Sequence, residues 1–219
     1  MASLNSILTG DAQLLSSSIP DESIDLIFTD PPYQKEFLPL YGWLAKESVR
    51  VLKPGGFLLT YAGNVHKDTV ILELSAQLEY FWDYITVHAG MGSIVWNRKT
   101  VARHKSILAY TKGQGKPRCN VLGLWTGTGT DKRYHQWGQD ESTARYYIDC
   151  FSSSSDIVWD PFCGGGTTPA ICKQLNRNFI AFEIDPATAD IARKRLETVQ
   201  PLLWQEDPTQ MLLESEAVS

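Results

Sequence analysis

Apolar and polar residues along this chain form blocks that predict strands and helices in alternation. Residues 24–30, IDLIFTD, and residues 57–63, FLLTYAG, are short apolar runs bounded by turn residues, a pattern typical of buried strands. Between them, residues 35–56 repeat their apolar positions with the period of an amphipathic helix and end in Pro-Gly-Gly. This order predicts an α/β protein with a mostly parallel central sheet and helices on both of its faces.

The same alternation continues to residue 199 and is interrupted by one irregular region. Residues 113–139 are rich in Gly and Thr and have no clear period, so we expect an irregular insert there. We expect a single domain over residues 1–219, since a chain of this length can form one α/β core. The other predicted elements are helices at 65–78, 141–151, 167–175 and 186–199, and strands at 80–89, 93–97, 106–111, 156–162 and 178–185.

Composition narrows the class of protein. No apolar run approaches the roughly 18 residues that cross a bilayer, and the N-terminus lacks a basic region followed by an apolar stretch. We therefore expect a cytoplasmic protein with no membrane contact. The cysteines form no C-x-x-C pair and have no histidine at zinc-ligand spacing, so we expect reduced thiols and no metal site. They are Cys119, Cys150, Cys163 and Cys172.

Positive charge is concentrated in one segment. Residues 97–135 carry nine of the chain's 20 Lys and Arg but one of its 25 Asp and Glu, although the whole chain has a net charge of -5. Such segregation indicates a surface for a polyanion, and the alternative is a solvated basic face. Aromatic residues that could stack on bases accompany it: Trp96, Trp125, Tyr134 and Trp137. The candidate nucleic-acid-binding residues are Arg98, Lys99, Arg103, Lys116, Arg118, Lys132 and Arg133.

A glycine turn follows one of the predicted strands. In DPFCGGGTT, residues 160–168, consecutive glycines let a ligand approach the backbone, and the next helix offers its N-terminal N–H groups to an anionic group. No lysine follows the glycines, which argues against a P-loop, and Pro169 stands where a dinucleotide fingerprint needs its last glycine. Glu183 lies about twenty residues past the turn, where an acid usually holds ribose hydroxyls. The pattern favours S-adenosylmethionine as cofactor, and the alternative is a purely structural turn.

A second motif, DPPY, ends the predicted strand over residues 24–30. An exocyclic base amine is a poor nucleophile because its lone pair is delocalised into the ring, and acceptors aimed at its two hydrogens favour the tetrahedral form that attacks. Asp30 and the backbone carbonyl of Pro31 are candidates for those acceptors, in a backbone stiffened by Pro31 and Pro32. Tyr33 would stack on the base, which must first be rotated out of a duplex. The alternative is a proline-rich turn in which Asp30 caps a helix.

Together and in this order, these motifs resemble the amino-group DNA methyltransferases of the permuted beta type, in which the catalytic motif precedes the cofactor motif. The resemblance rests on TDPPY, on WNRK followed by HKSILAYTKG, and on VWDPFCGGGTTPAICKQLNRNFIAFEID, and it extends to about residue 196. It implies a Rossmann-like sheet of seven strands whose sixth and seventh form an antiparallel hairpin. It also identifies residues 113–139 with a short target-recognition insert. Relatives of this group are often dimers, so a homodimer is left open.

The resemblance implies roles for single residues as well. In the family pattern Asp30, Pro31, Pro32 and Tyr33 would form the catalytic pocket. Glu183 would hold the cofactor's ribose and Asp11 its adenine amino group, while its amino-acid end would be held by Asp160, Phe162, Gly164, Gly166 and Thr167. One segment departs from the pattern: ESTARYY, residues 141–147, stands where a lysine-proline pair often begins the helix before the cofactor motif.

The sequence therefore predicts a site-specific, S-adenosylmethionine-dependent DNA methyltransferase of the restriction-modification kind, acting on double-stranded DNA after base flipping. The predicted target is N6 of adenine, because an aspartate opening DPPY is commoner among the adenine enzymes of the family. Three other hypotheses stay open. They are N4 of cytosine as the target, an amide or amine on RNA or protein as the target, and a catalytically inactive DNA-binding relative.

Overall fold

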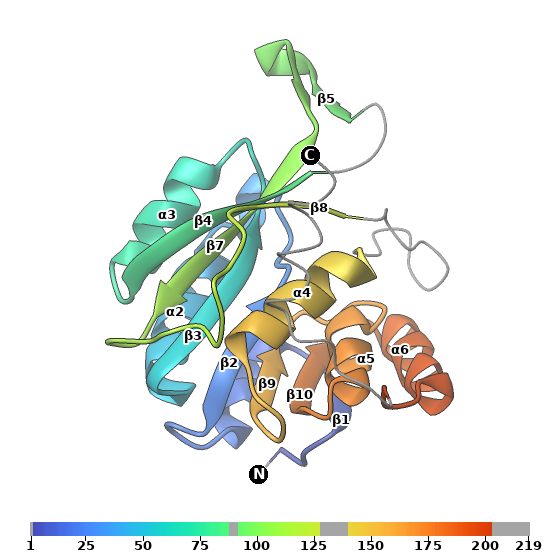
Figure 1. Ribbon diagram of the computed structural model, residues 1–219. Coiled ribbons are helices and arrows are strands. Elements are labelled where there is room, and N and C mark those ends of the chain that lie inside the picture. The colour runs from blue at the N-terminus through green and yellow to red at the C-terminus, as the bar shows by residue number, and fades with distance from the viewer. Residues whose placement is uncertain (1, 88–91, 128–139, 203–219) are drawn as a thin grey trace, which may run out of the picture.

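A sheet of eight strands, with helices on both faces, forms the body of the protein (Figure 1). The computed structural model describes residues 2–87, 92–127 and 140–202. In order across the sheet the strands are β1 (Ser6–Thr9), β10 (Asn178–Glu183), β9 (Ile157–Asp160), β2 (Ile24–Thr29), β3 (Leu52–Ala62), β7 (His104–Thr111), β4 (Glu79–Val87) and β8 (Leu124–Thr126). The first five strands in this order, β1, β10, β9, β2 and β3, are parallel to one another. Strand β7 is antiparallel to both β3 and β4, and β8 is parallel to β4.

Two groups of helices cover the two faces of the sheet (Figure 1). On one face, α4 (Glu141–Phe151), α5 (Thr167–Gln174) and α6 (Pro186–Thr198) share a hydrophobic core with the strands. The second core contains residues of α1 (Ala12–Leu15), α2 (Pro39–Val51) and α3 (Lys67–Ser75). The predicted fold class, an α/β protein with a mostly parallel sheet, is therefore confirmed.

The central strand β2 shows why its sequence is a continuous apolar run. Successive side chains point to opposite faces of a sheet, so Leu26 and Phe28 lie in the core with α4 to α6, whereas Ile27 lies in the other core. None of the three is more than 2% exposed. A parallel strand covered on both faces has no solvated side, and its sequence therefore lacks polar alternation.

The number of strands differs from the seven that the resemblance implied. Leu124–Thr126 adds β8 as an eighth strand along the outer edge of β4, where Ile85 is opposite Leu124. The ring of Trp125 stacks on Tyr146 of α4 with centroids 4.2 Å apart, which holds this short strand against the body. A strand of 3 residues between glycines and threonines is too short to give a periodic signal.

The helix predicted over residues 35–56 is shorter in the structure. The 3-10 helix η2 (Lys35–Phe37) comes first, and α2 then begins with Pro39 at its amino-terminal end. It ends at Val51, because residues 52–56 already belong to β3. Proline is favoured in a first helical turn, where its missing N–H needs no partner.

The carboxyl ends of the parallel strands meet at one edge of the sheet, which we call the carboxyl edge. DPPY follows the end of β2, the glycine turn follows the end of β9, and β10 ends at Glu183. The antiparallel strand β7 begins at this edge, since Ser106 pairs with Ala62 at the end of β3. The opposite, amino edge contains the end of β7, where Thr111 pairs with Phe57.

The sequence analysis also made predictions about the cysteines, about metal sites and about membrane-spanning helices. The four cysteines are free, and Sγ of Cys119 lies 3.2 Å from Sγ of Cys150. Within residues 2–87, 92–127 and 140–202, no cluster of three or more His, Cys, Asp or Glu side chains is placed to hold a metal ion. The same ranges contain no helix with the length and hydropathy that a membrane crossing requires.

Candidate active site

The two sequence motifs meet at the carboxyl edge, although 131 positions separate them. Strands β2 and β9 are parallel neighbours, with Ile27 opposite Trp159. The hydroxyl of Thr29, at the end of β2, donates a hydrogen bond of 2.7 Å to Oδ1 of Asp160, at the end of β9. The structure thus places DPPY and the glycine turn side by side, as their positions after parallel strands predicted.

Asp30 lies between a tyrosine and a lysine. The hydroxyl of Tyr33 donates a hydrogen bond to Oδ1 of Asp30, and Nζ of Lys105 lies 3.8 Å from Oδ2. Burial raises the pKa of the Asp30 carboxyl, whereas the Lys105 charge and the Tyr33 hydrogen bond lower it. Lys105 therefore favours the ionised carboxylate in a place where burial alone would favour the protonated acid.

The ring of Tyr33 lies against the backbone at Gly63, just past the end of β3. A Cβ atom on Gly63 would lie 3.0 Å from Cβ and from Cγ of Tyr33, so only glycine lets the ring pack this closely. Nζ of Lys105 lies 5.1 Å from the centroid of the Tyr33 ring and 5.5 Å from that of Tyr61. Burial, followed by the neighbouring Asp30 charge, raises the pKa of Tyr33, so its hydroxyl keeps its proton and donates.

Lys105 and Gly63 are site residues that the motifs did not reveal. In the sequence, Lys105 is one of several cations in the basic segment, and Gly63 ends a predicted strand. Gly63 follows β3, and Lys105 belongs to β7. They lie near DPPY because β3 and β7 come next to β2 in the sheet order. The signal that could have found them is their position at strand termini predicted to share the carboxyl edge.

Asp160 is a buried carboxylate, only 4% exposed. Its Oδ1 accepts hydrogen bonds from Thr29 and, at 3.1 Å, from the backbone N–H of Phe162. Burial raises the pKa of Asp160 to about 6, although hydrogen bonds from Thr168, Thr29 and Phe162 oppose that rise. Burial makes the ionised form of Asp160 unfavourable, and a cation bound beside it would stabilise that form.

The glycines of the turn have different structural roles. Gly164 has a φ of +50° and Gly166 a φ of +79°, both in the left-handed region that disfavours other residues. A Cβ atom on Gly164 would have no neighbouring atom within 4 Å, so the turn faces open space there. A Cβ atom on Gly166 would instead lie 2.9 Å from Cβ of Ala192 in α6. Gly164 leaves room for a ligand, whereas Gly166 lets two helices pack.

Glu183 ends β10, and Asp11 lies two positions past the end of the neighbouring strand β1. Oε2 of Glu183 accepts the N–H of Gly164 at 2.9 Å, and Oε1 accepts the N–H of Asp185 at the same distance. The N–H of Gly10 donates to the backbone oxygen of Glu183 at 2.9 Å, which brings Asp11 to the same edge. There Asp11 caps α1 by accepting the N–H of Gln13.

Arg195 ties the glycine turn to two helices, a contact that the sequence did not indicate. This residue of α6 is only 5% exposed. Its Nη1 donates to the backbone oxygen of Gly165 at 2.9 Å and to Oγ1 of Thr167 at 3.2 Å. Its Nη2 forms an ion pair with Glu141, the first residue of α4. The segment that departs from the family pattern thus supports the turn through Arg195.

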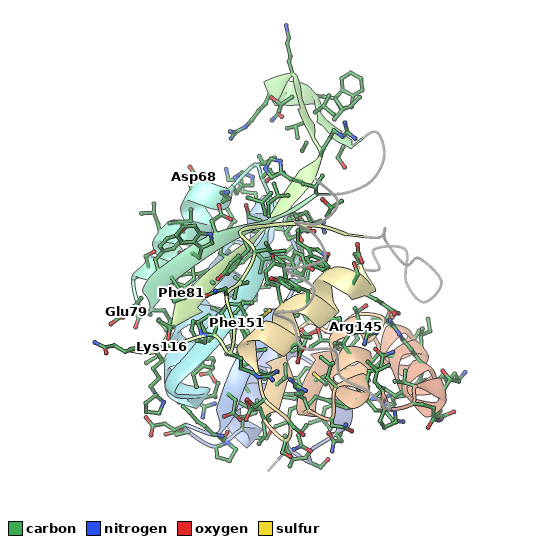
Figure 2. The ribbon with its side chains drawn as sticks, in the orientation of Figure 1. Asp68, Glu79, Phe81, Lys116, Arg145 and Phe151 are labelled. Carbon is green, nitrogen blue, oxygen red and sulfur yellow. The ribbon has the colours of Figure 1, made fainter. Side chains whose placement is uncertain are left out.

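The five predicted nucleic-acid-binding residues within the described ranges lie at two separate places. Arg98 and Lys99 lie in the turn of a hairpin, and exposed Arg103 follows its second strand. Lys116 and Arg118 come after the end of β7 at the amino edge, and Figure 2 shows Lys116 near Glu79, the first residue of β4. The structure therefore does not bring these two residues to the carboxyl edge with the other three, and their contact with nucleic acid stays a prediction.

Arg118 has a structural partner at the amino edge. Its Nη1 lies 2.9 Å from Oδ1 of Asp149, which also pairs with the buried Arg177 at 2.6 Å. The basic segment is divided because β7 runs from one edge of the sheet to the other between Arg103 and Lys116. Lys132 and Arg133 lie outside the described residues.

The site as a whole fits a cationic nucleoside with an amino-acid end. Asp11, Asp30, Asp160 and Glu183 bring four carboxylates to the carboxyl edge, beside the open space at Gly164. Glu183 keeps lone pairs for hydroxyl donors, because each of its oxygens has more than one lone pair and accepts a backbone N–H with one of them. The buried Asp160 is suited to an ammonium or sulfonium charge. The residues present therefore fit S-adenosylmethionine.

Comparison with known proteins identifies a family. The model of the family N6_N4_Mtase, described as DNA methylase, matches residues 24–194. The type II methyltransferase M.HinfI of Haemophilus influenzae is 28% identical over 262 residues, an alignment that covers 90% of this chain and 70% of M.HinfI. Across four curated type II methyltransferases, the chain spans 57% to 70% of the relative's length.

Solved structures share the fold. The DNA modification methylase TTHA0409 of Thermus thermophilus, in complex with S-adenosyl-L-methionine, aligns with a TM-score of 0.74 at 21% identity and covers 92% of this chain and 99% of its own. The cytosine-N4-specific PvuII DNA methyltransferase aligns with a TM-score of 0.76 at 19% identity, covering 100% of this chain and 93% of its own.

Proposed function

This chain belongs to the DNA methylase family, and from that premise we propose that it methylates an exocyclic base amine, N6 of adenine, at specific sites in double-stranded DNA. S-adenosylmethionine is the methyl donor. The observation that supports the proposal is the contact of Thr29 with Asp160, because it joins the DPPY turn to the glycine turn. We propose a single catalytic domain over residues 1–219 with a target-recognition insert at 113–139.

We assign the cofactor to residues at the carboxyl edge, from the end of β1 to the start of α5. Asp160, Phe162, Gly164, Gly166 and Thr167 would hold the amino-acid end, Glu183 the ribose hydroxyls and Asp11 the adenine amino group. When bound, S-adenosylmethionine supplies an electrophilic methyl group. Gly164 supports this assignment because no protein atom occupies the space beside it.

Asp30 would bind the target amine as an ionised acceptor. An exocyclic amine has two hydrogens, and the Asp30 carboxylate with the Pro31 carbonyl would accept one each, which frees the nitrogen lone pair from the ring. A protonated Asp30 would offer a donor where an acceptor is needed. Lys105, 3.8 Å away, favours the ionised form. The amine nitrogen loses one proton in the reaction, and the hydrogen bond to Asp30 holds that proton until it leaves to solvent.

Tyr33 has two competing contacts in this scheme. Its hydroxyl donates to the oxygen of Asp30 that an incoming amine would also use. When the amine replaces the hydroxyl as donor, the Tyr33 ring is free to stack on the flat face of the base. The packing of Tyr33 on Gly63 keeps the ring beside Asp30 during that exchange. Pro32 shapes the turn and makes no direct contact with the reacting atoms.

The choice of base depends on a single residue. Asp30 at the start of DPPY favours adenine, since the family's cytosine enzymes more often begin this motif with serine. The shared fold does not discriminate, because the PvuII structure is that of a cytosine-N4-specific enzyme. Cytosine N4 is therefore the alternative target, followed by an amine or amide on RNA or protein.

Tritium transfer from labelled S-adenosylmethionine to duplex DNA, RNA and protein tests the substrate class. Sequencing of DNA from expressing cells, with detection of modified bases, tests the base and the site. We expect label in duplex DNA and N6-methyladenine at one sequence. N4-methylcytosine would contradict the choice of base, and label only in RNA or protein would contradict the proposed substrate. Sedimentation in solution tests whether the chain forms a homodimer.

A further inference from the structure

A two-stranded hairpin projects from the body of the protein (Figure 1). Its strands are β5 (Ser93–Val95) and β6 (Thr100–Ala102), which pair antiparallel with Ile94 opposite Val101. The 3-10 turn η3 (Trp96–Arg98) closes it. The hairpin belongs to neither core and stands clear of the eight-stranded sheet.

The hairpin rises from the rim of the candidate active site. Only three positions past the end of β6, Lys105 places its ammonium beside Asp30. One contact holds the base of the hairpin to the loop after β3, and a second holds its turn to the same loop. The side chain of Asn64 donates to the backbone oxygen of His104 at 2.9 Å, and Nη2 of Arg98 donates to that of Val65 at 3.0 Å.

The hairpin is long enough to span the depth of a DNA groove. Thr100, near the tip, lies five positions before Lys105. An extended strand rises about 3.3 Å per residue, so the tip lies roughly 17 Å from Lys105. The major groove of B-DNA is about 8.5 Å deep and about 12 Å wide, which admits a two-stranded β-ribbon. A duplex that offers a base to Asp30 would therefore meet this ribbon.

The surface of the hairpin is both apolar and basic. Trp96 is 80% exposed, Val101 55% and Ile94 51%. Arg98, Lys99 and Arg103 lie beside them, and residues 92–105 contain no Asp or Glu. The cations complement phosphate groups, whereas the exposed tryptophan needs a flat or apolar partner. A second copy of the chain bound to the hairpin would lie beside Asp30, in the space through which the duplex has to approach.

We propose that the β5–β6 hairpin enters the major groove beside the target base and that Trp96 inserts into the base stack. There its ring fills the gap that the extruded base leaves. Rotating a base out of the duplex costs stacking, and an aromatic ring stacked on a neighbouring base recovers part of it. The inference rests on the proposed function, since it presumes a duplex from which one base is extruded.

The experiment compares Trp96→Ala, Trp96→Phe and wild type in single-turnover methyl transfer. Two duplexes carry the mapped target site, one with the target base paired and one with it opposite an abasic position, where extrusion is already cheap. We expect Trp96→Ala to lose about 10- to 100-fold on the paired duplex, the range that one aromatic stacking contact supplies. On the second duplex it should act within about threefold of wild type, and Trp96→Phe should lie between. Trp82→Ala, which removes a 54% exposed tryptophan from β4, is the matched control and should change neither rate.

The outcomes separate the two proposals. A Trp96→Ala rate equal to wild type on the paired duplex, or an equal loss on both duplexes, would overturn the insertion of Trp96 and leave the proposed function standing. A wild-type chain inactive on both would overturn the proposed function and the insertion with it. Self-association that Trp96→Ala abolishes without a loss on the paired duplex would assign the hairpin to a second copy.

Discussion

The hydroxyl of Thr29 donates a hydrogen bond of 2.7 Å to the carboxylate of Asp160, across 131 positions of the chain. This bond joins the last residue of β2 to the last residue of β9, and both are buried, at 1% and 4% exposure. It fixes the DPPY turn and the glycine turn relative to one another at the ends of two neighbouring strands. The geometry that methyl transfer requires is therefore held by strands and not by loops alone.

Replacing Asp30 tests its role as the acceptor for the target amine. We expect Asp30→Ala to lower kcat by about 100- to 1,000-fold, the usual effect of removing one transition-state hydrogen-bond partner. Binding of S-adenosylmethionine, measured by calorimetry, should stay near the wild-type value because Asp30 binds the target amine and makes no direct contact with the cofactor in the proposed scheme. Asp21→Ala, at a side chain that is 74% exposed, is the control. Normal turnover in Asp30→Ala would remove the catalytic assignment.

Lys105 is expected to set the acid limb of the pH–rate profile. Its charge lowers the pKa of Asp30, so its removal raises that pKa and leaves Asp30 protonated at a higher pH. The rate of Lys105→Met should therefore begin to fall at a higher pH on acidification than that of wild type. Lys105→Arg keeps the charge and should keep the limb near its original position. An acid limb unmoved in Lys105→Met would show that Lys105 does not act on Asp30.

Asp160 should make the apoprotein less stable as the pH rises. Burial raises its pKa from 3.8 to about 6 in the folded state, so the folded form holds the proton more tightly than the unfolded form. The associated stability is present in full below pH 4 and is lost as the pH rises through 6. A difference of two pKa units corresponds to about 3 kcal/mol of unfolding free energy.

The variant Asp160→Asn measures that loss. Its amide oxygen can still accept from Thr29 and Phe162, but the side chain cannot ionise. In urea unfolding without cofactor, we expect the variant to gain about 1.4 kcal/mol on wild type as the pH rises from 5 to 7.5, about half of the full difference, because the rest is lost between pH 4 and 5. Its affinity for S-adenosylmethionine should fall. A pH-independent difference would contradict the burial of an ionised carboxylate at this position.

The two positive-φ glycines should respond differently to alanine. At Gly164 only the left-handed backbone is strained, so Gly164→Ala should cost about 1–2 kcal/mol of stability. Its new methyl group would project into the proposed ligand space and weaken S-adenosylmethionine binding. At Gly166 the methyl group also meets Ala192 at 2.9 Å, which adds roughly 1–3 kcal/mol. Urea unfolding and calorimetry on the pair check this order; a Gly164→Ala variant with unchanged affinity would place the ligand elsewhere.

Several features of this protein follow from local sequence alone. The apolar run of β2 predicted a strand covered on both faces, because a strand with no polar alternation cannot have a solvated side. The positions of DPPY and of the glycine turn directly after strands predicted that they share an edge, because parallel strands all end on the same side of a sheet. These inferences needed only short-range periodicity and the residues at the strand ends.

Other features depend on which strands are neighbours and in which direction they run. Gly63 and Lys105 belong to the site because β3 and β7 follow β2 across the sheet, an order set by packing on both faces and not by any motif. The antiparallel direction of β7 determines where the residues of the basic segment lie. An antiparallel strand of 8 residues separates its ends by roughly 27 Å, so Arg103 stays near the pocket while Lys116 and Arg118 are carried to the opposite edge. The sequence alone determined the charges and the chemistry of the motifs, whereas strand direction decided which of those charges reach the site.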